Sequence, residues 1–243
     1  EDKILKNRRK TLGLLRDLKN IKTVGVISED KEKGIIEIAK PVGVVAAVTP
    51  STNPAATPIN NIINALKGRN SIIVSPSPAG SKVFRDLLIL INNELKKIGA
   101  PENLIQTFNC DVTKELTNEL MKNVDLVIVT GSLNNVREAA KSGTKAIGVG
   151  QGNVTSIVDE TADLEDAFKK IKMSKTFDNA TSCSSENNLI LIEDIYEKAI
   201  NLLSKENAVL LNKNQKEVLQ KNLWIDGKLN RKIIAKSAKF IAN

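Results

Sequence analysis

The two cysteines of the chain, Cys110 and Cys183, are its strongest candidate nucleophiles. Cys183 lies in a polar, small-residue stretch at 174–187, SKTFDNATSCSSEN, which predicts an accessible thiol in a loop. Cys110 follows a predicted strand end without such neighbours, so we expect a structural role for it. The chain has no histidine, which excludes Cys/His dyads, Ser/His/Asp triads and imidazole metal sites. Two distant cysteines also give neither a disulfide framework nor a cysteine-rich metal site, so no metal is predicted.

Small hydroxyl residues and glycine follow three predicted strands, where they could bind a phosphate group. They are Thr49, Pro50, Ser51, Thr52 and Asn53 after the first strand, Ser75 and Ser77 after the second, and Gly131 and Ser132 after the fourth. Backbone N–H groups and helix N-termini in such loops can bind anions. Each loop has an equally ordinary interpretation as a turn or helix cap, and neither GxGxxG nor GxxxxGK[ST] is present. Three such loops together favour a phosphate-containing ligand.

The elements that must position these residues alternate regularly along the chain. Strands are predicted at 42–48, 71–74, 104–108, 124–129 and 146–149, with helices at 54–66, 81–97, 114–122 and 134–142 between them. The nearly continuous apolar run 42–48 fits a strand buried on both faces. The alternation predicts an α/β fold with a doubly wound parallel sheet and right-handed crossovers. Ligands of such sheets bind at the carboxyl ends of the strands.

Both ends of the chain depart from this alternation. The first twenty residues predict a helix with Ile4, Leu12, Leu14, Leu15 and Leu18 at helical spacing, and two β-like runs follow at 23–27 and 34–39. Later, a short strand is predicted at 157–158, a helix at 162–174, a polar loop at 176–188 and a strand at 189–192. Helices should dominate from 195 to the end.

The net charge of +8 comes from 36 basic and 28 acidic residues, which are interspersed along the chain. Mixed charge of this kind predicts a solvated surface, although a basic nucleic-acid-binding module is a rival interpretation. No apolar run reaches the ~20 residues of a membrane span, and no signal-peptide pattern opens the chain. We therefore expect no nucleic acid partner, no membrane association and a cytoplasmic location.

Four segments together resemble the CoA-acylating branch of the aldehyde dehydrogenase superfamily. They are 48–54, 148–153, 159–163 and 174–187, and the resemblance covers nearly the whole chain. It implies an aldehyde dehydrogenase-like Rossmann-type sheet, with a nucleotide-binding domain over 1–182 that includes the preceding helix and β segment. Residues 183–243 would begin a second α/β catalytic domain that is apparently truncated. A homo-oligomer, dimer or tetramer, is implied for the full-length protein.

The resemblance also implies a reaction. Cys183 would attack an aldehyde, hydride would pass to NAD or NADP, and the resulting thioester would be transferred to coenzyme A. The backbone N–H of Cys183 and the Thr52–Asn53 turn would hold the oxyanion, although hydrolytic members carry this asparagine one place earlier. The implied cofactor-binding residues are Thr49, Pro50, Ser51, Thr52, Ser75, Ser77, Gly131, Ser132 and Gly150.

Two departures from the hydrolytic members bear on the acyl acceptor and the cofactor. Val149 occupies the position of their glutamate base, and losing a general base removes a factor of about 10²–10⁴ from attack by water. A thiol needs less activation, so coenzyme A is the expected acceptor. Ser75 and Pro78 occupy the positions of a lysine and a glutamate that hold the adenosine ribose, which leaves both NAD and NADP open.

A finer match concerns the substrate. The segments 75–78, 177–187 and 226–231 resemble members that act on sulfoacetaldehyde, and Arg231 could pair with a sulfonate. Sulfoacetaldehyde is therefore the expected substrate, with acetaldehyde as the alternative. A non-catalytic nucleotide-binding fragment is the other alternative, suggested by the apparent truncation.

Overall fold

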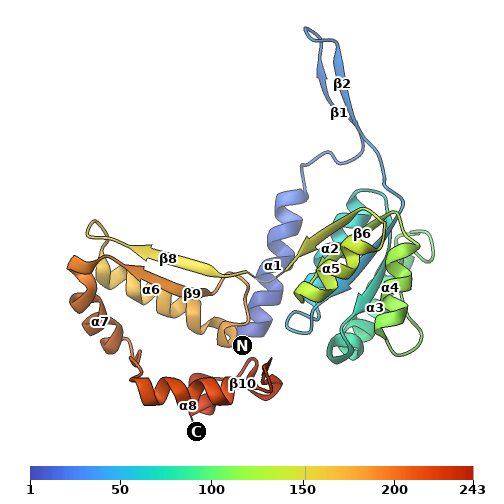
Figure 1. The fold of residues 1–243 in the computed structure, drawn as a ribbon. Helices are drawn as coiled ribbons and strands as arrows, with labels where there is room; N and C mark the ends of the chain where they lie inside the picture. Colours follow the sequence, from blue (N-terminus) through green and yellow to red (C-terminus); the bar gives the residue numbers. More distant parts are fainter. Residues whose placement is uncertain (151, 243) are drawn as a thin grey trace. The chain divides into compact units, whose positions relative to one another are not determined.

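A computed structural model describes residues 1–150 and 152–242, and Figure 1 shows their elements in chain order. The chain forms two compact units, one over Lys3–Gln151 with Glu1 and one over Gly152–Asn243 with Asp2. The predicted boundary at 182/183 separates a nucleotide-binding domain from a catalytic domain. It divides the chain by function and not by compactness, so it stays a prediction.

The first unit is built on a five-stranded sheet in which every neighbouring pair is parallel. Its strands are β3 (Val44–Thr49), β4 (Ser71–Pro76), β5 (Ile105–Thr107), β6 (Leu126–Thr130) and β7 (Ala146–Val149), in the order β5-β4-β3-β6-β7. The chain order reverses beside β3, which is the doubly wound topology predicted from the alternating pattern. The carboxyl ends of β3 and β6 flank this reversal, where such sheets bind ligands.

Four helices cover the two faces of this sheet. They are α2 (Ala56–Lys67), α3 (Ser81–Lys97), α4 (Lys114–Lys122) and α5 (Leu133–Lys141), and a short 3-10 helix, η1 (Pro78–Gly80), precedes α3. Val45 and Ala47 of β3 pack in one core cluster with α2 and α3, whereas Ala46 and Val48 pack in another with α4 and α5. The strand is thus buried on both faces, as its unbroken apolar run predicts.

A helix and a hairpin precede the sheet, namely α1 (Asp2–Leu18), β1 (Gly25–Asp30) and β2 (Ile35–Ala39). The predicted helix forms, but its apolar residues do not make its buried side. Ile4 is 74% exposed, whereas Lys6 is only 3% exposed. Helical spacing of leucines therefore identified the helix and not the side of it that packs.

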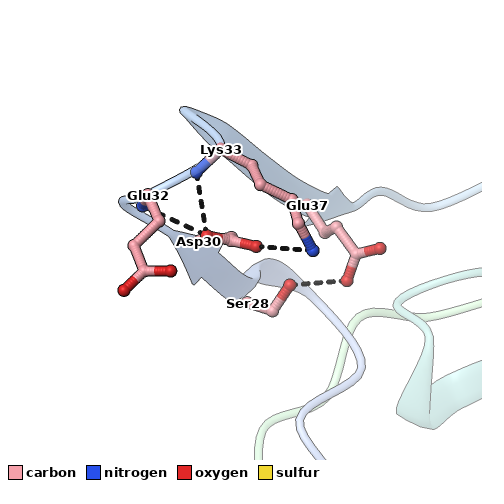
Figure 2. Close-up of polar contacts among 5 residues, drawn as sticks. All are labelled: Ser28, Asp30, Glu32, Lys33 and Glu37. Carbon is pink, nitrogen blue, oxygen red and sulfur yellow. Dashed lines mark hydrogen bonds and ion pairs between the residues drawn. The ribbon is translucent and has the colours of Figure 1, made fainter.

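Polar contacts organise the β1–β2 hairpin, as Figure 2 shows. The Asp30 carboxylate accepts hydrogen bonds from the backbone N–H groups of Glu32 and Lys33 at 3.1 and 3.0 Å. The ammonium of Lys33 lies 3.3 Å from the same carboxylate, and Ser28 donates to Glu37 across the strands at 2.5 Å. The hairpin turn is thus closed around one side chain.

The second unit begins with a two-stranded parallel sheet of β8 (Val154–Val158) and β9 (Glu186–Leu191). The connection between these two strands contains α6 (Leu164–Thr176) and the 3-10 segment η2 (Phe177–Ala180). After β9 come η3 (Glu193–Ile195) and α7 (Tyr196–Lys205). A small core joins these elements through Val158, Leu164, Phe168, Ile195 and Ala199.

The last part of the chain is mainly helical, as predicted, and it also contains a short hairpin that was not predicted. Between α8 (Lys213–Leu223) and α9 (Ala238–Ala242) lie a hairpin of β10 (Trp224–Ile225) and β11 (Lys228–Leu229) and the short helix η4 (Arg231–Ile233). The hairpin turns at Asp226 and Gly227, whose φ angles are +50° and +71°. Asp-Gly is a strong signal for such a two-residue turn, and it was available in the sequence.

In residues 1–150 and 152–242, no helix has the length and apolar character needed to cross a membrane. The same residues hold no cluster of acidic, cysteine or histidine side chains suited to a metal ion.

Candidate functional site

Two unpaired hydroxyl groups, those of Thr49 and Ser77, lie at the carboxyl ends of β3 and β4 in the first unit. The backbone N–H of Ser77 donates to the carbonyl of Thr49 at 3.1 Å, which joins the two strand ends. Thr49 is 3% exposed, and the hydroxyl oxygens of both residues are buried without a hydrogen-bond partner among the described residues. Leaving a buried hydroxyl unpaired costs about 1–3 kcal/mol. These two groups therefore fit a bound polar ligand that supplies the missing hydrogen bonds.

Ser75 lies beside them but plays a different part. It is 1% exposed, and its hydroxyl lies 2.9 Å from that of Thr117 on α4. Its side chain thus supports the strand end and offers a ligand no free hydroxyl. Gly80 closes the other side of this loop, because an added Cβ would lie 3.0 Å from Pro54 Cβ and 3.2 Å from Ser77 Oγ.

The end of β6 meets the first turn of α5. The N–H of Gly131 donates to the carbonyl of Val149 at 3.1 Å, and Ser132 caps the helix by accepting from the N–H of Asn135 at 3.2 Å. The ordinary interpretation of Ser132 as a helix cap is therefore correct for its hydroxyl group. The helix N-terminus itself still favours an anion, and it follows β6 beside the reversal of strand order. A dinucleotide pyrophosphate suits this position.

The turn after β3 contains the predicted residues Pro50, Ser51, Thr52 and Asn53. Ser51 is exposed, whereas Asn53 is 9% exposed and its Oδ1 atom is buried without a partner among the described residues. Sequence reasoning missed one contact here, in which Lys3 Nζ on α1 donates to the Thr52 carbonyl at 3.1 Å. No local pattern could have found it, because the two residues are 49 positions apart.

The segment after β7 carries Val149 and Gly150. Val149 ends the strand and is 52% exposed. An added Cβ at Gly150 would lie 3.7 Å from Leu133 Cδ1, which places this glycine beside the start of α5. Gln151 of the same motif lies outside the described residues.

The second unit holds Cys183, which is exposed, as its polar neighbourhood predicts. Cys110, in the first unit, is exposed as well. Its expected role as a small buried residue is therefore wrong, because the segment after β5 stays at the surface. Exposure alone does not distinguish the two thiols, and the distinction rests on their surroundings.

The loop before Cys183 has an unusual backbone. Asp178, Asn179 and Ala180 have φ angles of +52°, +49° and +57°, a conformation that costs a non-glycine residue roughly 1–2 kcal/mol. The Thr181 hydroxyl donates to the Asp178 carbonyl at 2.9 Å, and the Asn179 amide donates to the carbonyl of Ala235 at 2.9 Å. These bonds hold the loop in its left-handed turn.

Directly after Cys183 the chain turns again. The N–H of Ser185 donates to the carbonyl of Ser182 at 3.1 Å, and the buried Ser185 hydroxyl oxygen has no partner among the described residues. Gly152 approaches closely, because an added Cβ there would lie 3.6 Å from the Cys183 carbonyl. The thiol is thus exposed on a backbone that is held on both sides.

The segment 159–163, part of the resemblance, has a structural role. The Asp159 carboxylate accepts from the hydroxyl and the backbone N–H of Thr161, and these hydrogen bonds hold the Asp159 pKa below its usual value. Asp163 caps α6 by accepting from the N–H of Asp166 at 3.2 Å.

Residues 3–219 match the aldehyde dehydrogenase family. The chain is 53% identical over 242 residues to an acylating sulfoacetaldehyde dehydrogenase of Cupriavidus necator, matching 100% of this chain and 49% of the relative. It thus spans about half the length of the curated relatives it matches.

Solved structures give a consistent result. An acetylating aldehyde dehydrogenase from Geobacillus thermoglucosidasius superposes with a TM-score of 0.94 at 39% identity, covering 100% of this chain and 54% of that one. A propionaldehyde dehydrogenase from Rhodopseudomonas palustris, solved with bound CoA and an acylated cysteine, has a TM-score of 0.78 at 34% identity, covering 83% of this chain and 47% of its own.

Proposed function

Because this chain belongs to the aldehyde dehydrogenase family, we propose that its protein oxidises a short aldehyde to an acyl-CoA with NAD(P)⁺. The single observation that carries the proposal is the exposed Cys183, which lies between η2 and β9. Similarity over the whole chain to an acylating dehydrogenase supports the acylating form of the reaction.

In this proposal Cys183 forms the covalent intermediate. Its thiolate attacks the aldehyde carbon, so that a carbon–sulfur bond forms and the carbonyl oxygen becomes an oxyanion. The Cys183 N–H and the Asn53 amide are proposed to donate hydrogen bonds to that oxygen. Bound NAD(P)⁺ supplies the hydride acceptor that makes the intermediate a thioester. The CoA thiol then displaces Cys183 and takes the acyl group, which restores the free cysteine.

The first unit is proposed to hold the dinucleotide. The unpaired hydroxyl groups of Thr49 and Ser77 fit its polar groups, and the N-terminus of α5 after Gly131 and Ser132 fits its pyrophosphate. Pro50, Ser51, Thr52 and Gly150 would shape the surrounding loops, and Ser75 would act through its contact with Thr117.

Sulfoacetaldehyde is the proposed substrate, supported by the name and 53% identity of the Cupriavidus necator relative. Its sulfonate requires a cation or several hydrogen-bond donors. Arg231, exposed at the start of η4, is the proposed cation. Asn179 and Thr181 already donate hydrogen bonds within the second unit, so these donor groups are less available to bind a sulfonate.

The test uses the complete gene product and measures NAD(P)H formation with and without CoA. Wild type should require CoA, and Cys183→Ala should lose at least 10³-fold in rate, an order of magnitude typical for a missing covalent nucleophile. Cys110→Ala, the matched control at the other exposed cysteine, should keep normal turnover. Turnover that survives in Cys183→Ala, or that ignores CoA, would contradict the proposal.

The substrate is tested with sulfoacetaldehyde, acetaldehyde and propionaldehyde, each with NAD⁺ and NADP⁺. The highest kcat/KM should belong to sulfoacetaldehyde. A higher value for acetaldehyde would overturn the substrate while leaving the acylating chemistry intact.

A further inference from the structure

Helix α1 buries polar side chains, whereas several apolar residues of the same helix stay exposed. Lys6 is 3% exposed and Lys3 is half-buried, whereas Leu12 and Leu15 are 53% and 46% exposed. Lysine is rarely buried, because removing its charge from water is unfavourable without compensating contacts. A helix that packs in this way adds little to a hydrophobic core. It is better suited to orient polar groups of the segment it contacts.

Lys3 makes the contact that reaches the candidate site. Its ammonium donates to the Thr52 carbonyl at 3.1 Å. This carbonyl and the N–H of Asn53 belong to one planar peptide group, so a hydrogen bond at the oxygen orients the whole plane. A cationic donor also polarises the peptide group, which makes the N–H on its far side a stronger donor.

Asn53, at the other end of this peptide, is nearly buried, and no hydrogen bond from the described residues holds its side-chain oxygen. It is 9% exposed, and its Oδ1 atom is buried without a hydrogen-bond partner among the described residues. The direction of its side chain therefore depends on the backbone from which it projects. A rotation of the Thr52–Asn53 peptide would redirect the Asn53 amide, and misplacement by about 1 Å can cost 10²-fold in rate.

We propose that Lys3 is a positioning residue for Asn53. Its hydrogen bond to the Thr52 carbonyl holds the Thr52–Asn53 peptide in the orientation from which the Asn53 amide donates to the oxyanion. This inference rests on the proposed function, in which Asn53 is that donor. Lys3 itself touches neither aldehyde nor cofactor, and it acts on the reaction through the backbone.

The first test compares three substitutions in the complete gene product. Lys3→Met removes the donor, and kcat should fall about tenfold while the KM values for aldehyde and nucleotide stay within about twofold. Lys3→Arg restores a cationic donor and should recover most of the rate. Lys10→Met makes the same change at an exposed lysine of α1 and should leave kcat unchanged. Equal losses in Lys3→Met and Lys10→Met, or no rescue by arginine, would overturn the proposal.

The second test asks whether Lys3 acts through Asn53. Asn53→Ala should lower kcat by about 10²–10³, and adding Lys3→Met to it should then cost less than about twofold. A further tenfold loss in the double variant would mean that Lys3 acts independently, against the proposal. A Lys3→Met protein that cannot fold would equally contradict it. If wild type shows no CoA-dependent oxidation at all, the proposed function fails, and that result is separate from any difference among the Lys3 variants.

Discussion

Val136 on α5 fills the space directly in front of Gly148 on β7. An added Cβ at Gly148 would lie only 2.6 Å from Val136 Cγ1, closer than nonbonded carbon atoms approach. The backbone of Gly148 is not left-handed, so space alone requires glycine there. This pair sets how closely α5 approaches the strand that ends in Val149.

Gly148→Ala should therefore destabilise the protein by about 1–3 kcal/mol, because valine has a stiff side chain and the helix or strand must shift. Val136→Ala in the same chain should recover part of the loss. Denaturant unfolding measures both changes. Gly13→Ala is the control, since an added Cβ there meets nothing within 4 Å and alanine favours a helix. Equal stabilities of Gly148→Ala and wild type would show that the site relaxes freely.

Val149 predicts the fate of the thioester. With CoA present, acyl-CoA should exceed free acid, because no carboxylate side chain stands at this position to activate water. Chromatography of the products after a fixed time gives the ratio directly. The position is 52% exposed, so Val149→Glu should be accommodated and should raise the share of free acid. Mostly free acid from wild type would contradict this prediction.

Asp30 should titrate below pH 3.8 in the folded hairpin. The backbone N–H of Lys33 lowers its pKa most, burial opposes this, and the ammonium of Lys33 and the N–H of Glu32 lower it further. A lowered pKa means that the carboxylate stabilises the turn above its ordinary pKa of 3.8. That contribution is lost as pH falls through the lower folded value. Chemical-shift titration of the Asp30 carboxyl measures the midpoint.

Asp30→Asn is the matched variant for this titration. The asparagine side-chain oxygen can still accept the two backbone hydrogen bonds, so the turn should persist. The NMR chemical shifts of the backbone amides in the turn should no longer depend on pH. A wild-type midpoint at or above 3.8 would show that these hydrogen bonds do not persist in solution.

Ala180→Gly should stabilise the second unit by about 0.5–1 kcal/mol. Ala180 has a φ angle of +57°, which strains a side chain, whereas glycine adopts it freely and loses only part of the gain to backbone entropy. Thermal unfolding provides the measurement. Ala139→Gly, at a buried position in the last turn of α5, should instead lower stability. Destabilisation by both substitutions would contradict the left-handed turn before Cys183.

The sequence alone determined the sheet and the accessible thiol. The spacing and length of the apolar runs predicted which segments of the chain are strands and which are helices. A strand buried in a parallel sheet must be apolar on both faces, and each crossover must be long enough for a helix. Val45 to Val48 show this directly, since consecutive residues pack in two different core clusters. The polar, small residues around Cys183 likewise predicted an accessible thiol, and the residue is exposed.

The tertiary structure decided which residues of these elements are engaged and which are free. Ser75 and Ser77 stand two positions apart in one loop, yet Ser75 lies within hydrogen-bond distance of Thr117 and Ser77 has a buried, unpaired hydroxyl. Cys110 is exposed where a structural thiol was expected. Lys3 reaches Thr52 from 49 positions away, on a helix whose leucines pointed to a different packing side. Local patterns report the average burial of a segment, whereas the partner of a single polar atom depends on which distant segment the fold brings within about 3 Å of it.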